Sequence, residues 1–365
     1  MPHHFTDQAF RNLRHAALGW LDMKVRLAEI AARAGVSVST VSRVLNEKAG
    51  VNPVTRRQVL TAIDVLGYDR PARLRPRAAG LVGLIVPELE NPFFPLFAQL
   101  VETNLARHGY TPVLCSQTLG GVHEDDYVRI LLEHGVSGII FVSGIHAISD
   151  SDPERYQKLA EFGLPFVLVN GFHAEIPAAS FSTDEGAAMD LAVSHLVNMG
   201  HHHIGLALGQ PRYTPCQRKV AGFRDSMRRH FPDIHEQDLD SVIEHTTFTI
   251  EGGTLAARQL VARGVTAIIC GSDVMALGAI RAIRQVGLRV PHDVSVVGSD
   301  DGPLNEFCDP PLTSVRQPAT ALATAVCRAL TDQIAGERVP PTDQLFHPEL
   351  VVRASTTRAA REVGV

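Results

Sequence analysis

The stretch 26-RLAEIAARAGVSVSTVSRVLN-46 contains two short helical patterns that meet at a single glycine. In the first pattern, apolar residues recur at the spacing of one helical face; they are Leu27, Ile30, Ala31 and Ala34. Gly35 can supply the positive φ of a tight turn, and Ser37 can cap the helix that follows. A small residue, a glycine and a β-branched residue thus stand where a helix-turn-helix needs close helix approach, a turn and a core contact.

The outward face of the second helix carries short or hydrogen-bonding side chains, which are suited to reading base edges in a DNA major groove. These side chains belong to Val38, Ser39, Thr40, Ser42, Arg43 and Asn46. A helical hairpin whose polar face meets only water is the alternative, and the spacing favours DNA binding over it. Asn52 and Pro53 provide a cap and a first-turn proline for a third helix, which we expect to end at Gly67. These patterns predict a three-helix DNA-binding head over 24–67.

The formal charge of the chain is −5, but this charge is unevenly distributed. Residues 24–80 hold eleven Lys and Arg residues against four acidic residues, which gives +7. Residues 1–23 carry two charges of each sign, so the remainder, 81–365, carries −12. A basic head on an acidic body is the pattern expected when only the head meets phosphate. A membrane-binding surface would need an apolar face, and 70-RPARLRPRAAG-80 offers only Leu74 for one.

Length and cysteine use indicate a cytoplasmic protein of two or three domains. The chain has 365 residues, and none of its apolar runs approaches the length of a membrane span. Its five cysteines show no metal-binding spacing, and we expect reduced thiols at Cys115, Cys216, Cys270, Cys308 and Cys327. Residues 1–23 lack the apolar core of a signal peptide. The residues before Met23 carry no clear pattern, and Met23 and Lys24 directly precede the helix-turn-helix, so we expect a poorly ordered N-terminal extension over 1–23.

From Leu81 onward, short apolar runs alternate with helical patterns. The runs predict strands that begin near 81, 111, 137, 166, 204, 267 and 294. The helical patterns lie near 92–108, 123–134, 153–162, 184–199, 215–230, 250–263 and 273–287. Continuous apolar strands between helices are typical of parallel sheets covered on both faces, and their number predicts two α/β subdomains. Ligands of such sheets bind at the loops that follow the strands.

We find no enzyme motif in the sequence. A dinucleotide or phosphate glycine loop, a nucleophile elbow and a zinc-binding His pair are all absent. The histidines at 201–203 are adjacent, and adjacent residues of a regular element cannot converge on one metal ion. Asp150 with Asp152 and Asp300 with Asp301 lack a recognisable catalytic partner, so we interpret them as hydrogen-bond acceptors in a binding cleft. We expect neither a metal nor a cofactor.

From Val25 to about Thr357, the chain resembles the lactose-repressor (LacI/GalR) family of bacterial transcription regulators. The motifs that carry the resemblance are AxxAGVSxxTVSRVLN at 31–46, VxPxTRxxV at 51–59, NPFF at 91–94, GVSGIIF at 135–141, SDVMALGAIRA at 272–282, VSVVGSDD at 294–301, PPLTSVRQP at 310–318 and PELVVRAST at 348–356. Within the family the chain is similar to the actinobacterial maltose and maltodextrin regulators, through DVLGYDRPARLR, TPVLCSQT and QRKVAGF.

The resemblance implies a helix-turn-helix head followed by a two-lobed α/β body like that of periplasmic sugar-binding proteins. The implied parts are an N-terminal extension over 1–23, the head over 24–67, a basic hinge over 68–80, lobe one over 81–173 and 317–338, lobe two over 174–316 and 339–357, and a tail over 358–365. A homodimer would place its two heads on a near-palindromic operator in double-stranded DNA. A small sugar-like effector, such as maltose or a maltodextrin, would bind between the lobes and shift the population that binds DNA.

The resemblance also implies effector contacts on loops of both lobes. Lobe one offers Asn91, Phe93, Phe94, Phe97, Gln117 and Asn170. Lobe two offers Arg218, Lys219, Phe248, Ser272, Asp273 and Asp300. Aromatic rings can stack on the C–H faces of a pyranose, while amides, carboxylates and cations can bind its hydroxyl groups. A core position is an equal alternative for the three lobe-one phenylalanines, and a helix cap is the favoured alternative for Asp273.

The implied DNA contacts extend beyond the second helix, to Arg26, Ser37, Asn52, Thr55, Arg73 and Leu74. Two features depart from the family pattern. Pro71 and Pro76 interrupt the hinge, so any hinge helix must be very short, and Leu74 is the residue that could enter the minor groove. Arg26 stands where family members often have a hydroxyl cap, and it can contact phosphate instead.

Two other functions remain as alternatives. A sugar-binding protein without a DNA role would carry an export signal and a neutral N-terminus, and this sequence shows neither. A regulator with a non-sugar effector, such as a nucleobase or a phosphorylated metabolite, fits the same motifs. The sequence predicts neither the operator nor whether the effector releases or promotes DNA binding.

Overall fold

The computed structural model describes residues 27–46, 48, 50–66, 68, 79–117 and 121–359. The chain divides into two compact units, 1–77 and 78–365, which we call the head and the body and describe separately.

The head contains the three predicted helices. The first covers 27–34, α2 spans Val38–Leu45 and α3 spans Pro53–Val65. Gly35 has a φ of 67° at the turn, and the Ser37 hydroxyl accepts a hydrogen bond from the Thr40 amide at 3.2 Å, which confirms the expected turn and cap. All three helices bury residues in one core, made by Ile30, Ala31, Val41, Val44, Val59, Ala62 and Ile63. Because isolated helices of this length are marginal in water, the shared core stabilises them.

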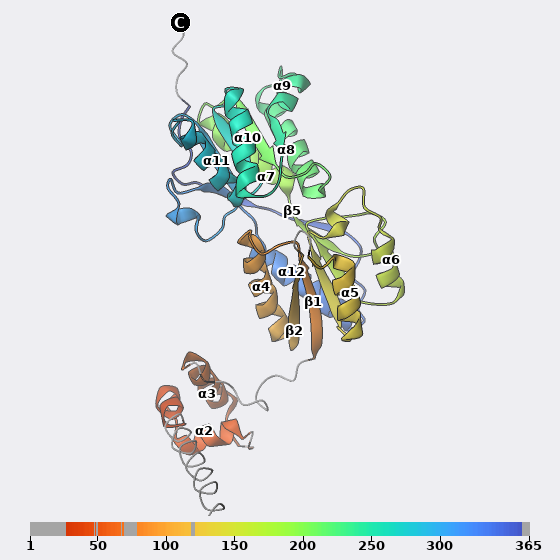
Figure 1. Ribbon diagram of the computed structural model, residues 1–365. Helices are drawn as coiled ribbons and strands as arrows, with labels where there is room; N and C mark the ends of the chain where they lie inside the picture. Colours follow the sequence, from red (N-terminus) through yellow and green to blue (C-terminus); the bar gives the residue numbers. More distant parts are fainter. Residues whose placement is uncertain are drawn as a thin grey trace, which may run out of the picture. The chain divides into compact units, whose positions relative to one another are not determined.

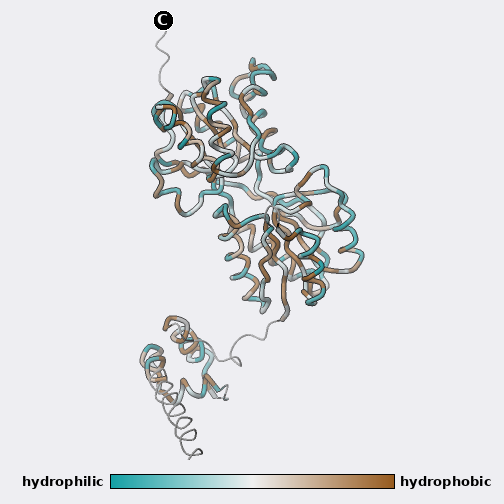
Figure 2. The backbone as a smooth tube through the Cα atoms, viewed as in Figure 1, coloured by the Kyte–Doolittle hydropathy of each residue, from teal (hydrophilic) through white to brown (hydrophobic). Residues whose placement is uncertain are grey.

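Lobe one of the body is a six-stranded parallel sheet in the order β11-β5-β4-β3-β1-β2. Its strands are β1 (Gly80–Val86), β2 (Tyr110–Ser116), β3 (Gly138–Val142), β4 (Phe166–Val169), β5 (Ser180–Thr183) and β11 (Asp343–Phe346). Helices α4 (Phe93–Arg107) and α12 (Ala319–Ile334) bury one face of the sheet, and α5 (Glu124–Glu133) and α6 (Glu154–Glu161) bury the other (Figure 1). With both faces covered, the central strands β3 and β4 are continuously apolar (Figure 2).

Lobe two is built in the same way, around a sheet in the order β12-β10-β9-β8-β6-β7. Its strands are β6 (Ile204–Leu208), β7 (Ile243–His245), β8 (Ala267–Cys270), β9 (Ser295–Asp300), β10 (Thr313–Arg316) and β12 (Glu349–Val351). Strand β12 pairs antiparallel with β10, and the other pairs are parallel. The helices are α7 (Glu185–Asn198), α8 (Thr214–His230), α9 (Glu236–Ser241), α10 (Ile250–Ala262) and α11 (Asp273–Gln285).

Two glycines allow α10 and α11 to pack with their backbones close together. A Cβ atom on Gly278 would lie 2.1 Å from the Ile250 carbonyl oxygen, and one on Gly253 would lie 2.0 Å from the Met275 carbonyl oxygen. Neither backbone atom could move aside cheaply, so the contact requires glycine at both positions. This packing fixes α11, whose first turn lies at the end of lobe two that faces lobe one.

The chain crosses between the lobes later than predicted at two places. Strand β5 pairs with β4, and β11 pairs with β5, so both belong to the first sheet. The predicted boundaries at 173/174 and 338/339 are therefore wrong: lobe one comprises 79–183 and 317–346, and lobe two comprises 184–316 and 349–357. Both strands escaped recognition because SFST and DQLF are not apolar runs, although β5 is fully buried. Across the described ranges, no helix is both long and apolar enough to span a membrane.

Candidate functional site

Within the described residues, positive φ angles at non-glycine positions gather at the ends of strands. Ser143 (46°) follows β3, Asn170 (62°) follows β4, and Asp300 (115°) and Asp301 (55°) lie at the end of β9. Such conformations are rare outside glycine and concentrate at binding sites. Asn170 Nδ2 donates to Ser143 Oγ at 3.2 Å, which ties the two lobe-one loops together. We call the boundary between the two lobes the lobe junction. The unusual backbone of these loops indicates that the candidate binding site lies there.

Asn91 and Asp300 meet across the lobe junction. Asn91, just before α4, donates from Nδ2 to Asp300 Oδ2 at 3.0 Å, and its Oδ1 accepts from the Phe93 amide at 3.0 Å. The second oxygen of Asp300 accepts from Gln317 Nε2 at 2.6 Å, and Gln317 Oε1 accepts from the Thr183 hydroxyl at 2.9 Å. Gln317 and Thr183 lie on segments where the chain crosses between the lobes. Two predicted effector residues therefore belong to one hydrogen-bonded group that joins both lobes.

Asp273 supports the loop that follows β9. The N-cap of α11 is Ser272, whose hydroxyl accepts from the Met275 amide at 3.2 Å, so the helix-cap interpretation of Asp273 was wrong. Asp273 is buried, and its carboxylate accepts from the Gly302 amide at 2.8 Å and from the Ser314 hydroxyl at 2.6 Å. Both bonds stay within lobe two. The Asp273 carboxylate thus positions the loop that follows β9, and both of its oxygens have partners within lobe two.

The environment of Asp300 weakens its acidity. Burial, followed by the negative charge of Asp273, raises the pKa of Asp300 to about 7, against the opposing effects of the hydrogen bonds from Asn91 and Gln317 and the charge of Lys219. Burial likewise raises the pKa of Asp273 to about 6. Asp300 therefore changes charge near neutral pH, where an ordinary aspartate stays ionised.

Both cations predicted at the junction are already paired. Lys219 is buried and forms an ion pair with Glu185, the first residue of α7. Arg218 forms an ion pair with Asp343 of β11 in lobe one, with Nη2 and Oδ2 2.7 Å apart. A cation that is removed from water and matched to a carboxylate offers little net charge to a third group. Neither cation is therefore available to neutralise an anionic effector.

Two of the predicted aromatic contacts are core residues. Phe93 and Phe97 are 3% and 0% exposed and pack with α12 in the core of lobe one, so their effector assignment was wrong and the core alternative holds. Phe94 is only half-buried, and its ring meets that of Phe93 edge-on with centroids 5.5 Å apart. Phe248 is half-buried and fills the space beside Gly209, where an added Cβ atom would lie 2.2 Å from the ring. Phe94 and Phe248 remain candidates for a sugar face.

Three further residues, Glu124, Tyr156 and Gln317, organise the junction and were not among the predicted site residues. Gln117 Nε2 donates to Glu124 Oε2 at 3.2 Å, and this buried carboxylate also accepts from the Tyr156 hydroxyl at 2.5 Å. Glu124 opens α5 among other acids, as many helices begin, so nothing singled it out or pointed to Tyr156. Gln317 lies in the quoted motif at 310–318, and its place beside a predicted lobe crossing could have identified it.

The histidines at 201–203 make structural hydrogen bonds. His201 Nδ1 lies 2.9 Å from the Thr266 hydroxyl and its Nε2 2.9 Å from the Thr357 carbonyl oxygen, while His203 Nδ1 lies 3.1 Å from the Gly264 carbonyl oxygen. In the parts of the chain that the structure describes, no group of three or more His, Cys, Asp or Glu side chains could hold a metal ion.

In the head, the predicted recognition side chains line the outer face of α2. Val38, Ser39, Arg43 and Asn46 are exposed, and Thr40 and Ser42 are half-buried. The Ser37 hydroxyl lies 2.8 Å from the hydroxyl oxygens of both Ser39 and Thr40, and Asn46 Nδ2 donates to the Ser42 carbonyl oxygen at 2.8 Å. These bonds fix the directions of the small polar side chains on an exposed face.

The remaining predicted DNA contacts fall into two groups. Asn52 caps α3, since its Oδ1 accepts from the Val54 amide at 2.8 Å, and Thr55 is half-buried on the first turn. Arg26, Arg73 and Leu74 lie outside the described residues, as do the hinge prolines.

Two family models match separate parts of the chain. Residues 26–70 match bacterial regulatory proteins of the lacI family, and residues 193–356 match the periplasmic binding protein-like domain. The transcriptional regulator reg1 of Streptomyces lividans is 54% identical over 343 residues, which cover 94% of this chain and 99% of that protein. The regulator MalR of Streptomyces coelicolor is 54% identical over 342 residues, with the same coverage of 94% and 99%. This chain belongs to the lacI family.

Membership of the lacI family makes the chain a DNA-binding transcriptional regulator and not an enzyme. Solved structures of regulators share its architecture. A complex of the regulator CelR with cellobiose has a TM-score of 0.67 at 31% identity and covers 90% of this chain and 99% of its own. The lac repressor dimer bound to operator and the anti-inducer ONPF has a TM-score of 0.65 at 29% identity and covers 90% and 98%. These matches confirm the predicted helix-turn-helix head and two-lobed α/β body.

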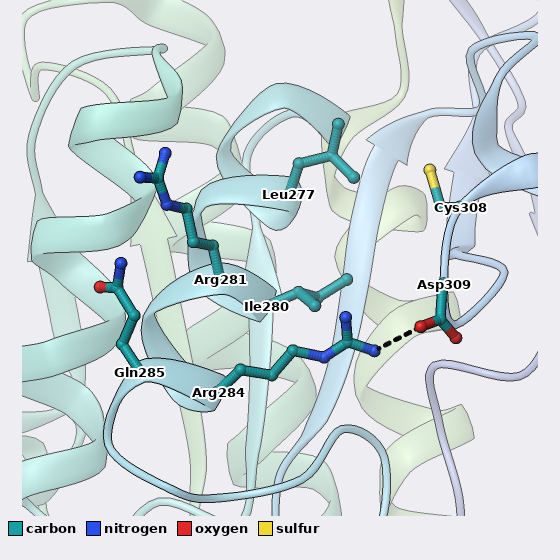
Figure 3. Close-up of a pocket in the computed structure, with 7 residues that line it drawn as sticks. All are labelled: Leu277, Ile280, Arg281, Arg284, Gln285, Cys308 and Asp309. Carbon is teal, nitrogen blue, oxygen red and sulfur yellow. Dashed lines mark hydrogen bonds and ion pairs between the residues drawn. The ribbon is translucent and has the colours of Figure 1, made fainter.

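Lobe two of this lacI-family chain also has an open groove of about 490 Å³ beside α11 (Figure 3). Its lining residues are Leu277, Ile280, Arg281, Arg284, Gln285, Cys308 and Asp309. Arg284 and Asp309 form an ion pair across it, with Nη2 and Oδ2 3.1 Å apart. The adjoining loop exposes two large apolar side chains, Leu304 (65% exposed) and Phe307 (75%). We call this groove with Leu304 and Phe307 the α11 face; exposed apolar clusters of this kind mark interaction surfaces.

Proposed function

We propose that the effector of this regulator is a neutral sugar, of the maltose or maltodextrin kind, bound at the lobe junction. The observation that carries the proposal is the hydrogen bond between Asn91 and Asp300, which joins the lobes through groups that also bind hydroxyls well. A sugar hydroxyl can replace each partner, donating to the carboxylate of Asp300 and accepting from the amide of Asn91. Phe94 and Phe248 are the aromatic candidates for the C–H faces of the sugar.

The state of the cations favours a neutral sugar over a phosphorylated one. Arg218 and Lys219 are matched by Asp343 and Glu185, and Asp300 adds negative charge when ionised. A phosphate group at the junction would meet the carboxylate of Asp300, and neither Arg218 nor Lys219 would be free to neutralise it. Similarity to the regulator named MalR and to the CelR–cellobiose complex adds support for a sugar.

The head supplies the DNA-binding surface of the proposed regulator. Helix α2 lies in the major groove, with Val38, Ser39 and Arg43 toward the base edges, while the cap residues Ser37 and Asn52 lie near phosphates. The contacts expected from Arg26, Thr55, Arg73 and Leu74 belong to the same proposal, as does action in the cytoplasm, where chromosomal DNA is found.

A homodimer presents two heads to a near-palindromic operator, and the α11 face is its proposed contact on lobe two. Leu277 lies in the groove, Phe307 projects beside it, and Arg284 and Asp309 provide opposite charges within the same surface. A two-fold axis brings each patch against itself, so the charges of one copy can meet the opposite charges of the other. The lac repressor, which shares this architecture, is a dimer on its operator.

Calorimetric titration of the full-length protein tests the effector proposal. The ligands are maltose, maltotriose, cellobiose, glucose and glucose 6-phosphate. We expect tight binding of maltose or maltotriose and a change in operator affinity at the same concentrations, measured by fluorescence anisotropy with an operator selected from random duplexes. Binding of glucose 6-phosphate alone would contradict the charge argument, and no binding of any of these sugars would remove the maltodextrin proposal.

Effector affinity is expected to fall as the pH is lowered through 7. The free protein holds Asp300 with a pKa of about 7, and its ionised form accepts a hydrogen bond from a sugar hydroxyl more strongly than its protonated form does. Binding therefore competes with protonation, and affinity falls by up to about tenfold between pH 8 and pH 6. Asp273 and Lys219 are the charged groups that act on Asp300. Any pH dependence of effector affinity that remains in the Asp300→Asn variant would therefore come from Asp273. An affinity that rises toward pH 6 would mean that protonated Asp300 donates to the sugar.

Replacement of Arg43 by alanine is expected to reduce specific operator affinity by about tenfold, which is the lower range for a bidentate base contact. Binding to unrelated duplexes should change much less. Anisotropy titrations with the operator and with an unrelated duplex measure the ratio of the two affinities. The control is Arg129→Ala, which replaces an exposed arginine on lobe one. An equal loss for both DNA types would assign Arg43 to phosphate contact.

A further inference from the structure

A second set of contacts joins the lobes outside the Asp300 group. The Ser149 amide of lobe one donates to the Arg212 carbonyl oxygen of lobe two at 2.8 Å, and Ser149 Oγ accepts from Gln217 Nε2 at 2.9 Å. The Arg212 guanidinium forms an ion pair with Asp150, with Nη2 and Oδ1 3.0 Å apart. An antiparallel backbone bridge adds to these bonds between residues 148 and 213. We call residues 148–150 with residues 212–217 the interlobe clasp.

The lobe-one side of the clasp is firmly anchored. Its loop leaves β3 and passes Ile145, whose amide donates to the buried carboxylate of Glu124 at 3.1 Å. The His146 amide donates to the Tyr156 hydroxyl at 2.9 Å, and His146 Nε2 lies 3.0 Å from the Val169 carbonyl oxygen. Burial lowers the pKa of His146 to about 4, so the ring stays neutral and Nε2 is the donor to Val169. The loop therefore moves as part of lobe one.

The lobe-two side of the clasp continues directly into α8 (Figure 1). One turn of this helix carries Gln217 of the clasp together with the paired cations Arg218 and Lys219. Helix α8 is held against α7, since a Cβ atom on Gly222 would lie 2.7 Å from the Gly186 Cα atom. Movement of the clasp residues relative to lobe one therefore requires movement of lobe two with them.

We propose that Asp150, Arg212 and Gln217 are positioning residues for the effector response: they hold the two lobes in the arrangement that this structure shows, without touching the effector. This inference rests on the proposed function. The clasp contacts exist only when the two loops are in register, so opening of the lobes breaks all of them together. An effector that contacts both lobes binds more tightly when the clasp already favours the arrangement that it needs. The clasp then supplies part of the free energy that holds the lobes together, and the effector supplies the rest.

A hydrogen-bonded route connects the clasp to the predicted effector position at Gln117. Glu124 accepts from Gln117 at 3.2 Å and from the Ile145 amide at 3.1 Å through the same oxygen, Oε2. A ligand that contacts Gln117 therefore acts on the carboxylate that holds the clasp loop. The exposed fractions of the Arg212 and Asp150 side chains are 50% and 69%, so these two residues lie at the surface, where they can open and close in water.

Charge reversal across the clasp tests the proposal on the full-length dimer. Asp150→Arg places two cations together, and we expect maltotriose affinity to fall by about three- to tenfold through faster dissociation. The double variant Asp150→Arg with Arg212→Asp restores the attraction and should return the affinity to within about twofold of wild type. Lys158→Glu is the matched control, because it breaks an ion pair of similar exposure within α6 of lobe one. Titration calorimetry and stopped-flow dissociation measure these effects.

Hydrogen exchange of residues 145–152 tests the clasp in the absence of a ligand. The Ser149 amide donates across the lobes, so Asp150→Arg should speed its exchange and the double variant should slow it again. Unchanged maltotriose affinity in Asp150→Arg, or a double variant as weak as the single one, would overturn the proposal while leaving the effector assignment intact. If the wild-type protein binds no sugar, the effector assignment fails. The clasp is then tested by hydrogen exchange alone: equal exchange rates of residues 145–152 in wild type and in Asp150→Arg would overturn it.

Discussion

Phe307→Asp is expected to convert the proposed homodimer into monomers and to weaken operator binding by about a hundredfold or more. The Phe307 side chain is 75% exposed in the single chain, so the substitution removes little from the folded monomer. In a two-fold interface the same substitution buries an aspartate in each copy, and an unpaired buried charge is costly. Two linked heads exceed one head in affinity by about 10² to 10⁴ through effective concentration alone, and monomers lose that gain.

Sedimentation equilibrium and operator titration measure the two consequences of Phe307→Asp separately. Phe162→Asp is a close control, since Phe162 is also 75% exposed but lies at the end of α6 in lobe one. The control should remain dimeric and bind the operator as wild type does. Binding of a single half-site should be the same in all three proteins, because the head is unchanged. A Phe307→Asp protein that stays dimeric with full operator affinity would exclude the α11 face as a dimer contact.

The parts of the fold that could be predicted from the sequence are those with a local cause. The head follows from the spacing of Leu27 to Val44 and from a turn at Gly35, all within one short stretch. Seven apolar runs correspond to β1, β2, β3, β4, β6, β8 and β9. Strand β5 is polar in sequence but buried: Ser180 Oγ donates to the Gly171 carbonyl oxygen at 2.9 Å, and the strand pairs with β4 on one side and β11 on the other. Its place depends on partners far away in the chain, which periodicity cannot reveal.

The same limit explains what the sequence does not reveal about the candidate site. Lys219 and Arg218 were predicted as effector contacts, but their ion-pair partners, Glu185 and Asp343, lie 34 and 125 residues away and could not be recognised from residue type. Asp300 was identified because a carboxylate directly follows an apolar strand. Its neighbour Gln317 was not, since its importance comes from the hydrogen bond to Asp300 and not from its own type. Position at the end of a strand was a better guide to the site than charge was.

Asp300→Asn is expected to reduce effector affinity by about ten- to a hundredfold. Asp300 accepts hydrogen bonds from two amide donors, Asn91 Nδ2 and Gln317 Nε2. An asparagine has only one acceptor oxygen, so its own NH₂ group must face one of these donors. A sugar hydroxyl also loses its hydrogen bond to a charged acceptor, which contributes about 1.5–3 kcal/mol. Titration with maltotriose measures the loss. Asp225→Asn, an exposed aspartate on α8 of the same lobe, is the control and should leave the affinity unchanged.

The stability of the Asp300→Asn variant distinguishes a binding role from a structural one. Folding raises the pKa of Asp300 from its ordinary value of 3.8 to about 7, so the folded state binds this proton more tightly than the unfolded chain does. The contribution of Asp300 to stability therefore falls as the pH rises between those two values, and at pH 8 the buried carboxylate is destabilising. Asparagine removes the cost of the buried charge but places its NH₂ group against an amide donor, so Asp300→Asn should unfold at about the same denaturant concentration as wild type at pH 8. Weaker effector binding together with lower stability would instead indicate that Asp300 holds the lobe junction together and that its effect on the sugar is indirect.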